Sequence, residues 1–286
     1  MTATESRKIS TVAVVGAGTM GRGLALVGLM NGLTVRLADK RADQLGVARD
    51  QITARLAKQG IDAIPPFTVG SAEEACSGAD LIIEAVFEDM GVKCSLLRLI
   101  ERAAPRDAII ASNTSGLSIA TLAEALQDPS RFLGMHFFNP VHRMALVEVI
   151  PAPATSEDTT DAAQAFAIRM GKTPILVSDS PGFVASRLNC MLGNEALMML
   201  EQGVAGAEAI DTAAKLGLNH PMGPLELLDL VGLDVRLAAQ RTLAAAYGER
   251  FAPTRLHEQL VADGRLGIKT RAGVYDYDED GKRVTP

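Results

Sequence analysis

The chain has 286 residues, enough for about two domains of ordinary size, and 48% of them are hydrophobic, which is sufficient for a full core. Its net charge of -6 and the lack of any basic block argue against a nucleic-acid or anionic-membrane partner. The three cysteines, Cys76, Cys94 and Cys190, are far apart and lack metal-site spacing. We therefore expect free thiols, no bound metal and a cytoplasmic location. The polar residues 1–10 do not resemble a signal peptide, and the longest uncharged apolar stretch, residues 23–35, is too short to span a bilayer.

The first part of the chain alternates between strand-like and helix-like segments. A β-branched run at residues 10–18 ends in glycines, a helical stretch follows at 20–32, and a second strand is predicted at 33–39. Further strands are predicted at residues 79–86, 107–112, 132–138, 146–150 and 173–179, mostly with helices between them. This alternation predicts an α/β domain with a mostly parallel sheet and right-handed connections.

The strand pattern disappears near residue 180. Residues 182–263 are typical of several helices, interrupted at the segments LGLNHPMGP and YGERFAP. We therefore expect a sheet domain over residues 1–180, followed by a smaller all-helical domain over residues 181–286. The last segment, YDYDEDGKRVTP, is predicted to be a loose surface end.

A glycine-rich sequence, GAGTMG, joins the first predicted strand to the first predicted helix. Its candidate cofactor-binding residues are Gly16, Gly18, Thr19, Met20 and Gly21. The glycines permit a tight turn, a close approach of the backbone to a pyrophosphate and close helix–strand packing, while the helix N-terminus attracts the phosphates. The hexapeptide alone is a weak signal, but its position between a strand and a helix predicts a Rossmann-type dinucleotide site.

An acidic residue, Asp39, ends the second predicted strand 18 residues after Gly21. A carboxylate at this place accepts hydrogen bonds from the ribose hydroxyls and repels a 2′-phosphate, so we expect NAD as the cofactor. Lys40 and Arg41 follow directly and could soften the rejection of NADP; the alternative is that they are a solvated helix start.

Two ionisable residues stand alone in apolar strand-like runs. His136 lies within residues 132–138, and Glu148 lies twelve residues later between Val147 and Val149. A lone histidine in such a strand is more often a satisfied core residue. However, a buried carboxylate is costly unless a proton donor meets it, and a histidine ring nitrogen is the obvious candidate. Such a pair orients the ring and makes its second nitrogen basic, as a general base requires.

The other three histidines have no comparable partner in the sequence. His142, His220 and His257 are therefore predicted to be surface or loop residues.

Seven blocks occur in order between about residue 9 and residue 277: VAVVGAGTMGRGLA, IIEAVFEDMGVK, ASNTSGLSI, FLGMHFFNPV, LVEVI, SPGFV and LGLNHPMGPLELLDLVGLD. They resemble the L-3-hydroxyacyl-CoA dehydrogenases, including bacterial 3-hydroxybutyryl-CoA dehydrogenases. The resemblance covers nearly the whole chain. It implies an NAD-binding domain and a helical domain that forms a homodimer, acting on a small acyl thioester in fatty acid metabolism.

The resemblance also implies catalytic roles. His136 would take the proton from the substrate's 3-hydroxyl while hydride passes to the nicotinamide, and Glu148 would hold and polarise His136. Ser115 would hydrogen-bond the reacting oxygen, and Asn139 would help to fix the thioester end.

On the cofactor side, the resemblance places Glu88 and Lys93 in the family's cofactor motif. It places Asn113 in the loop beside the nicotinamide.

Three features depart from the family pattern. Ser186 replaces an active-site asparagine, and Asn189, nearly one helical turn further on, is a possible substitute. The helical hairpin that usually follows the second strand and clasps the CoA nucleotide is shortened here, with Pro65 and Pro66 breaking any helix. Arg271 stands where the family usually has glycine.

The main expectation is an NAD-dependent 3-hydroxyacyl-CoA dehydrogenase. One alternative is a dehydrogenase whose 3-hydroxyacyl group is carried by acyl carrier protein, or a dehydrogenase of a free 3-hydroxy acid. Another is a non-catalytic NAD-binding protein, against which the joint presence of His136, Glu148 and Ser115 argues.

Overall fold

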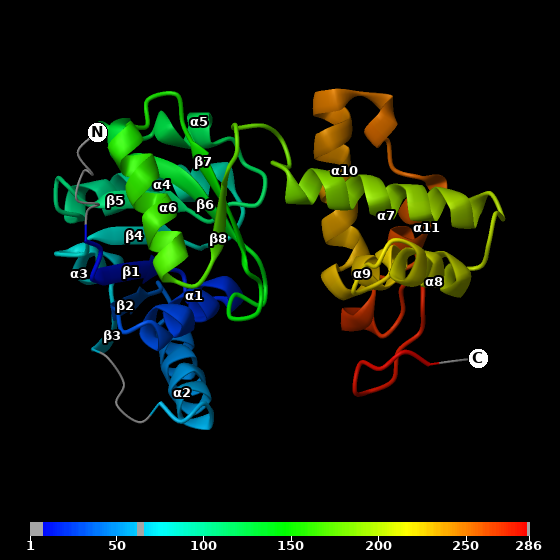
Figure 1. Cartoon of the computed structure of the whole chain (residues 1–286), viewed down its shortest axis with the longest axis horizontal. Coiled ribbons are helices and arrows are strands. Elements are labelled where there is room, and N and C mark those ends of the chain that lie inside the picture. Colours follow the sequence, from blue (N-terminus) through cyan, green and yellow to red (C-terminus); the bar gives the residue numbers. More distant parts are fainter. Residues whose placement is uncertain (1–7, 62–65, 285–286) are drawn as a thin grey trace. The chain divides into compact units, whose positions relative to one another are not determined.

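The computed structural model describes residues 8–61 and 66–284, so the polar residues 1–7 and Pro65, for which predictions were made, lie outside the described residues. The chain divides into two compact units, Met1–Ser180 and Pro181–Pro286. The first unit contains β1 to β8 together with helices, and the second unit is helical (Figure 1).

The first unit alternates strands and helices along its length. In chain order these are β1 (Thr11–Val15), α1 (Thr19–Met30), β2 (Thr34–Ala38), α2 (Ala42–Lys58), β3 (Phe67–Gly70), α3 (Ala72–Cys76), β4 (Leu81–Glu84), α4 (Met90–Ala103), β5 (Ile109–Ser112), α5 (Ile119–Ala123), η1 (Pro129–Arg131), β6 (Phe132–Phe137), β7 (Leu146–Pro151), α6 (Glu157–Arg169) and β8 (Thr173–Leu176).

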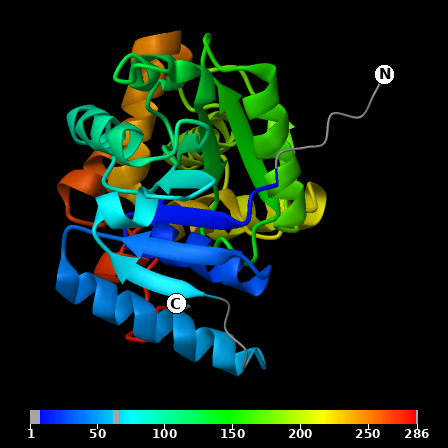
Figure 2. The same cartoon turned by 90° about the vertical axis from the view of Figure 1, so that its left-hand side faces the viewer.

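The eight strands form one sheet in the order β3-β2-β1-β4-β5-β6-β7-β8. All neighbouring pairs are parallel except β6 and β7, which are antiparallel. Figure 2 shows β1, β2 and the cyan β3 side by side, with the blue helix α2 beside them. The predicted mostly parallel α/β sheet is confirmed, and the strand order reverses between β1 and β4, where such sheets bind their ligands.

Helices cover both faces of the sheet. The main core joins apolar side chains of α1, α2 and α6, such as Leu24, Ile52 and Phe166, to one face of the strands. Ile82 and Ile110, which point to the opposite face, are fully buried as well. Helix α4 contacts both α3 and α5, and all three helices contact strands. Because both faces are covered, side chains of the central strands can reach a ligand at the strand ends.

The second unit consists of helices α7 (Ala185–Glu201), α8 (Ala207–Gly217), α9 (Pro224–Val231), α10 (Leu233–Tyr247) and α11 (Arg255–Ala262), with short turns η2 (Glu249–Phe251) and η3 (Ile268–Thr270). Its largest core cluster includes Leu197, Leu225, Leu228 and Leu233. The prediction of a helical unit is confirmed.

The C-terminal segment differs from the prediction of a loose end. Tyr275 donates its hydroxyl proton to Asp211 (2.8 Å), and Tyr277 donates to Asp229 (2.9 Å). Asp229 also accepts hydrogen bonds from the backbone N–H groups of Val274 and Tyr275. Asp211 and Asp229 are buried, so these bonds tie the segment to α8 and α9.

The prediction for His257 was also wrong. Its side chain is buried in α11, and its Nε2 lies 2.9 Å from the carbonyl oxygen of Leu233. Burial lowers the pKa of His257. The residue is thus a satisfied core histidine, whereas His142 and His220 lie outside helices and strands and are partly exposed.

A short strand, β3, was missed in the segment that replaces the longer hairpin. It pairs in parallel with β2 and forms the edge of the sheet. Within the described residues, no helix is both long and apolar enough to cross a bilayer.

Candidate active site

The candidate residues of the first unit gather where the parallel strands end. Gly16 follows β1, Asp39 follows β2, Glu84 ends β4, Asn113 follows β5, and His136 is the penultimate residue of β6. Carboxyl ends of neighbouring parallel strands meet at one edge of the sheet, so the topology alone brings these residues together.

The glycine loop leaves room only for glycine at two positions. Gly16 has φ of +114°, and a Cβ there would lie 2.5 Å from the carbonyl oxygen of Ala85. A Cβ on Gly21 would lie 1.7 Å from the carbonyl oxygen of Gly16. In contrast, nothing lies within 4 Å of a Cβ built on Gly18, the residue that precedes α1. Thr19 and Met20 are the first residues of that helix. The backbone N–H groups of a first helical turn have no partner within the helix, and the open space at Gly18 beside them suits an anionic ligand.

Asp39 is anchored to this loop. Its Oδ2 accepts a hydrogen bond from the backbone N–H of Ala17 (2.8 Å), and its Oδ1 accepts one from the N–H of Arg41 (3.0 Å). The carboxylate is partly exposed, while the side chains of Lys40 and Arg41 are exposed. The structure therefore fixes an acidic group beside the glycine loop.

His136 and Glu148 face each other across the antiparallel pair β6 and β7. The His136 Nδ1 lies 2.6 Å from Glu148 Oε2. Glu148 is fully buried and His136 is 6% exposed. Because an ionised carboxylate can only accept, we assign the Nδ1 proton as the donor, which makes Nε2 the basic nitrogen of the neutral ring.

An aromatic ring, Phe138, packs against His136. The two ring centroids are 4.3 Å apart and the ring planes are tilted by 51°. This contact and the hydrogen bond to Glu148 together fix the orientation of the imidazole ring. The sequence interpretation had not included Phe138.

Ser115 and Glu88 are bonded to each other. Glu88 Oε1 accepts hydrogen bonds from Thr114 Oγ1 (2.6 Å), the Ser115 backbone N–H (2.8 Å) and Ser115 Oγ (3.2 Å). Burial favours a higher pKa for Glu88, but the charge of Lys93 and these hydrogen bonds outweigh it, so its pKa lies below the usual value. Glu88 is therefore ionised at neutral pH.

Lys93 is buried, although the resemblance had placed it on the cofactor side. Its side chain is 1% exposed, and its Nζ lies 2.6 Å from Glu84 Oε1 and 3.3 Å from Glu88 Oε2. Glu84 is fully buried and was missed by the sequence interpretation. The available signal was a carboxylate at the end of an apolar strand with a lysine nine residues later.

The two candidate asparagines have different surroundings. Asn113 Oδ1 accepts a hydrogen bond from the backbone N–H of Phe137 (2.9 Å), which ties the end of β5 to the strand that carries His136. Asn139 lies beyond the end of β6 and is exposed.

Ser186 belongs to the second unit. It is the second residue of α7 and is partly exposed, as is Asn189 one turn further on.

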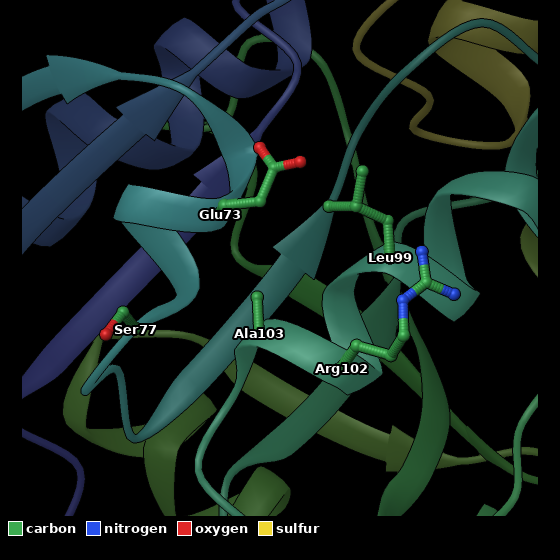
Figure 3. A pocket seen from close by; sticks show the side chains of 5 residues that line it. All are labelled: Glu73, Ser77, Leu99, Arg102 and Ala103. Carbon is green, nitrogen blue, oxygen red and sulfur yellow. The ribbon is translucent and has the colours of Figure 1, made fainter.

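A separate pocket lies at the other end of the strands, away from the candidate residues. It is lined by Glu73, Ser77, Leu99, Arg102 and Ala103 (Figure 3). Ser77 precedes β4 and Ala103 precedes β5, so the pocket lies where the strands begin. It includes none of the candidate residues.

Comparison with known proteins assigns both units to described domain families. Residues 11–180 match the family described as 3-hydroxyacyl-CoA dehydrogenase, NAD binding domain. Residues 182–277 match the family described as 3-hydroxyacyl-CoA dehydrogenase, C-terminal domain.

Individual relatives agree over nearly the full length. A protein of Bacillus subtilis named probable 3-hydroxybutyryl-CoA dehydrogenase is 40% identical over 283 residues, which cover 95% of this chain and 99% of the relative. Human mitochondrial hydroxyacyl-coenzyme A dehydrogenase is 38% identical, covering 94% of this chain and 91% of the relative. The crystal structure of an (S)-3-hydroxybutyryl-CoA dehydrogenase from Ralstonia eutropha has a TM-score of 0.89 at 38% identity, covering 95% of this chain and 100% of that one.

Proposed function

This chain belongs to the 3-hydroxyacyl-CoA dehydrogenase family of NAD-dependent oxidoreductases, and we propose that its substrate is a short acyl thioester, in the simplest case 3-hydroxybutyryl-CoA. The single observation that carries the proposal is the His136–Glu148 pair at the sheet edge that also holds the glycine loop. A base and a dinucleotide site at one edge suit the oxidation of an alcohol, in which a proton leaves the hydroxyl oxygen and a hydride leaves the carbon that bears it.

The residues present fit NAD. The open position at Gly18 and the amide groups at the start of α1 would hold the pyrophosphate, and Asp39 would accept from the ribose hydroxyls. Bound NAD supplies the hydride acceptor for oxidation of the alcohol carbon. Glu88 and Asn113 would contact the cofactor from the ends of the neighbouring strands, whereas Lys93 would act on it through Glu88.

His136 would serve as the general base at Nε2. In oxidation, Nε2 takes the proton of the 3-hydroxyl, and the ring becomes positively charged. Glu148 stabilises this charge through the 2.6 Å contact at Nδ1 and keeps the ring in one tautomer. In the reverse direction the same nitrogen returns the proton to the carbonyl oxygen.

Ser115 and Asn139 would orient the substrate. The Ser115 hydroxyl is exposed and would turn toward the reacting oxygen, while the Asn139 side chain would hold the thioester carbonyl. Ser186 is a further proposed catalytic residue, in place of the amide that the resemblance implies.

We further propose that residues 1–180 bind NAD and that residues 181–286 provide substrate contacts and a homodimer interface. Large apolar side chains of the second unit are exposed, among them Leu188, Leu216, Leu218 and Val235, as expected of a surface that a second copy covers. The described cysteines are free thiols, in keeping with a cytoplasmic enzyme of fatty acid metabolism.

One observation favours the alternative of an acyl carrier protein substrate. In the sequence only residues 59–66 separate α2 from β3, so the segment that the resemblance expects to clasp the nucleotide of CoA is short.

The test is a substrate panel followed by NADH absorbance: acetoacetyl-CoA, longer 3-ketoacyl-CoA esters, the carrier-protein thioester and free acetoacetate. We expect the highest kcat/KM for acetoacetyl-CoA. Turnover of the free acid alone would contradict the thioester assignment, and no turnover of any compound would favour a non-catalytic NAD-binding protein.

A further inference from the structure

A buried ion pair lies directly behind the groups that the proposed reaction uses. Glu84 and Lys93 are 0% and 1% exposed in their side chains, and neither has a direct part in the mechanism above. A buried ion pair is a poor source of stability, because the cost of desolvating two charges offsets their attraction. Its presence at this edge of the sheet therefore calls for another explanation.

The Glu84 carboxylate is fully satisfied by its surroundings. Oε1 accepts from Lys93 Nζ (2.6 Å) and from the backbone N–H of Val86 (2.7 Å), and Oε2 accepts from Ser112 Oγ (2.6 Å). Ser112 is the register partner of Glu84 on the neighbouring strand β5. The side chain thus has one fixed place, and it fixes the Lys93 ammonium in turn.

From Lys93 the contacts continue to the substrate side. Lys93 Nζ lies 3.3 Å from Glu88 Oε2, and the other oxygen of Glu88 accepts from Thr114 Oγ1, Ser115 N and Ser115 Oγ. The Ser115 Oγ contact, at 3.2 Å, is the longest of these three. The hydroxyl can therefore turn to a substrate oxygen while the backbone of Ser115 stays bound to Glu88.

We propose that Glu84 is a positioning residue of the reaction, which acts through Lys93 and Glu88 to hold Ser115 where it meets the reacting oxygen. The inference rests on the proposed function, because it needs Ser115 to contact that oxygen. Glu84 fixes the position of the Lys93 ammonium. Glu88 is then held by this ammonium at one oxygen and by residues 114 and 115 at the other. Without Glu84, the ammonium has Glu88 as its one carboxylate partner among the described residues and pulls it away from Ser115.

The variant Glu84→Gln tests this directly. We expect kcat for acetoacetyl-CoA reduction to fall at least about tenfold, because displacements of about 1 Å can lower a rate by about 10²-fold. Glu101→Gln is the matched control, since Glu101 is a mostly buried carboxylate at the far end of α4 that accepts from the backbone N–H groups of Gln127 and Asp128. We expect the control to keep wild-type kcat.

A double-mutant cycle with Ser115→Ala separates positioning from a general structural effect. If Glu84 acts through Ser115, adding Glu84→Gln to Ser115→Ala should lower kcat by less than about threefold further. An equal loss in both backgrounds, or a loss no greater than that of Glu101→Gln, would overturn the inference and leave the proposed function intact. A wild-type enzyme inactive on 3-ketoacyl and 3-hydroxyacyl thioesters would overturn both.

A second variant tests the inference in case Glu84→Gln alone does not fold. Glu84→Gln combined with Lys93→Met removes both buried charges together, and we expect it to fold with a melting temperature near that of the wild type. It should still lose at least about tenfold in kcat, because Glu88 lacks its cation. Full activity of this folded variant would overturn the inference.

Discussion

Glu148 lies directly opposite His136 across the antiparallel strands β7 and β6, and its Oε2 is 2.6 Å from the histidine Nδ1. The register of two strands, and not a loop, sets this distance. Side chains at directly opposed positions of an antiparallel pair lie on one face, so the backbone hydrogen bonds of the sheet hold the base and its partner together. A variant that keeps the sheet therefore tests the chemistry alone.

His136→Gln should lower kcat by about 10²- to 10⁴-fold, which is the usual contribution of a general base. The affinity for NADH should stay within about threefold, because the proposed role of the histidine is to act on the substrate oxygen and not on the cofactor. Stopped-flow turnover and a fluorescence titration with NADH measure the two quantities. Loss of NADH binding without loss of the fold would show that His136 supports the cofactor site instead.

Glu148→Gln should lower the rate and move the pH midpoint of the oxidation to a lower value. The protonated ring loses its anionic partner in this variant, so it releases its proton at lower pH. The pH dependence of kcat in the direction of 3-hydroxyacyl oxidation measures the shift. An unchanged rate and an unchanged pH profile would rule out a functional pair.

The parts of the fold that follow from local pattern were predictable. Alternation of apolar residues gave the order of strands and helices, and an isolated glutamate in an apolar strand indicated that a donor must meet it. The glycine loop could be predicted because a strand, three glycines and a helix are adjacent in sequence.

The failures concern partners that no local pattern reveals. His257 is satisfied by the carbonyl oxygen of Leu233, and every residue carries such an acceptor. The C-terminal tyrosines bond carboxylates that lie 48 and 64 residues away in sequence. Glu84 is a different case, because a lysine nine residues later was an available local signal that the sequence interpretation did not use.

NADH should be favoured over NADPH by at least about tenfold in kcat/KM. The Asp39 carboxylate is held by the backbone N–H groups of Ala17 and Arg41, so it cannot easily turn away from a 2′-phosphate. Like charges about 4 Å apart repel by roughly 1–4 kcal/mol at solvent-like to surface-like dielectric. Steady-state rates with both cofactors measure the ratio, and equal use would mean that Lys40 and Arg41 dominate.

Arg271→Gly should raise the free energy of unfolding by up to about 1 kcal/mol. Arg271 has φ of 60° and ψ of 10°, a left-handed conformation that costs a residue with a side chain about 1–2 kcal/mol, while glycine loses roughly 0.5–1 kcal/mol of chain entropy. Its ion pair with Glu279 is exposed and contributes little. This conformation is in keeping with the glycine that the resemblance implies at this position. Urea unfolding measures the change, and a loss of more than about 1 kcal/mol would mean that the arginine side chain stabilises the C-terminal segment.

Ser186→Asn should lower kcat/KM for acetoacetyl-CoA. The side chain is partly buried in the first turn of α7, and we expect that its surroundings have adapted to serine, so that asparagine adds excess volume. The matched control is Asn189→Ser, which tests whether the amide one turn later substitutes for the missing one. A clear gain in kcat/KM for Ser186→Asn would show that serine is a weakened form of the family's asparagine.

Truncated thioesters should be accepted with a small loss. The proposed reacting end of the site keeps Ser115, His136 and Glu148, whereas in the sequence only residues 59–66 separate α2 from β3. Binding energy from a distant nucleotide can be used to orient the reacting carbon, so its loss lowers kcat as well as affinity. If the short segment between α2 and β3 contributes little to binding the nucleotide, removal of the nucleotide costs little binding energy. We expect kcat/KM to fall by less than about a hundredfold, or under about 3 kcal/mol, from acetoacetyl-CoA to the pantetheine and N-acetylcysteamine thioesters.

A much larger fall would mean that the chain still binds the nucleotide and that CoA is the carrier. A small fall together with a high KM for acetoacetyl-CoA would instead favour a carrier protein, because its own surface would supply the contacts that the chain lacks.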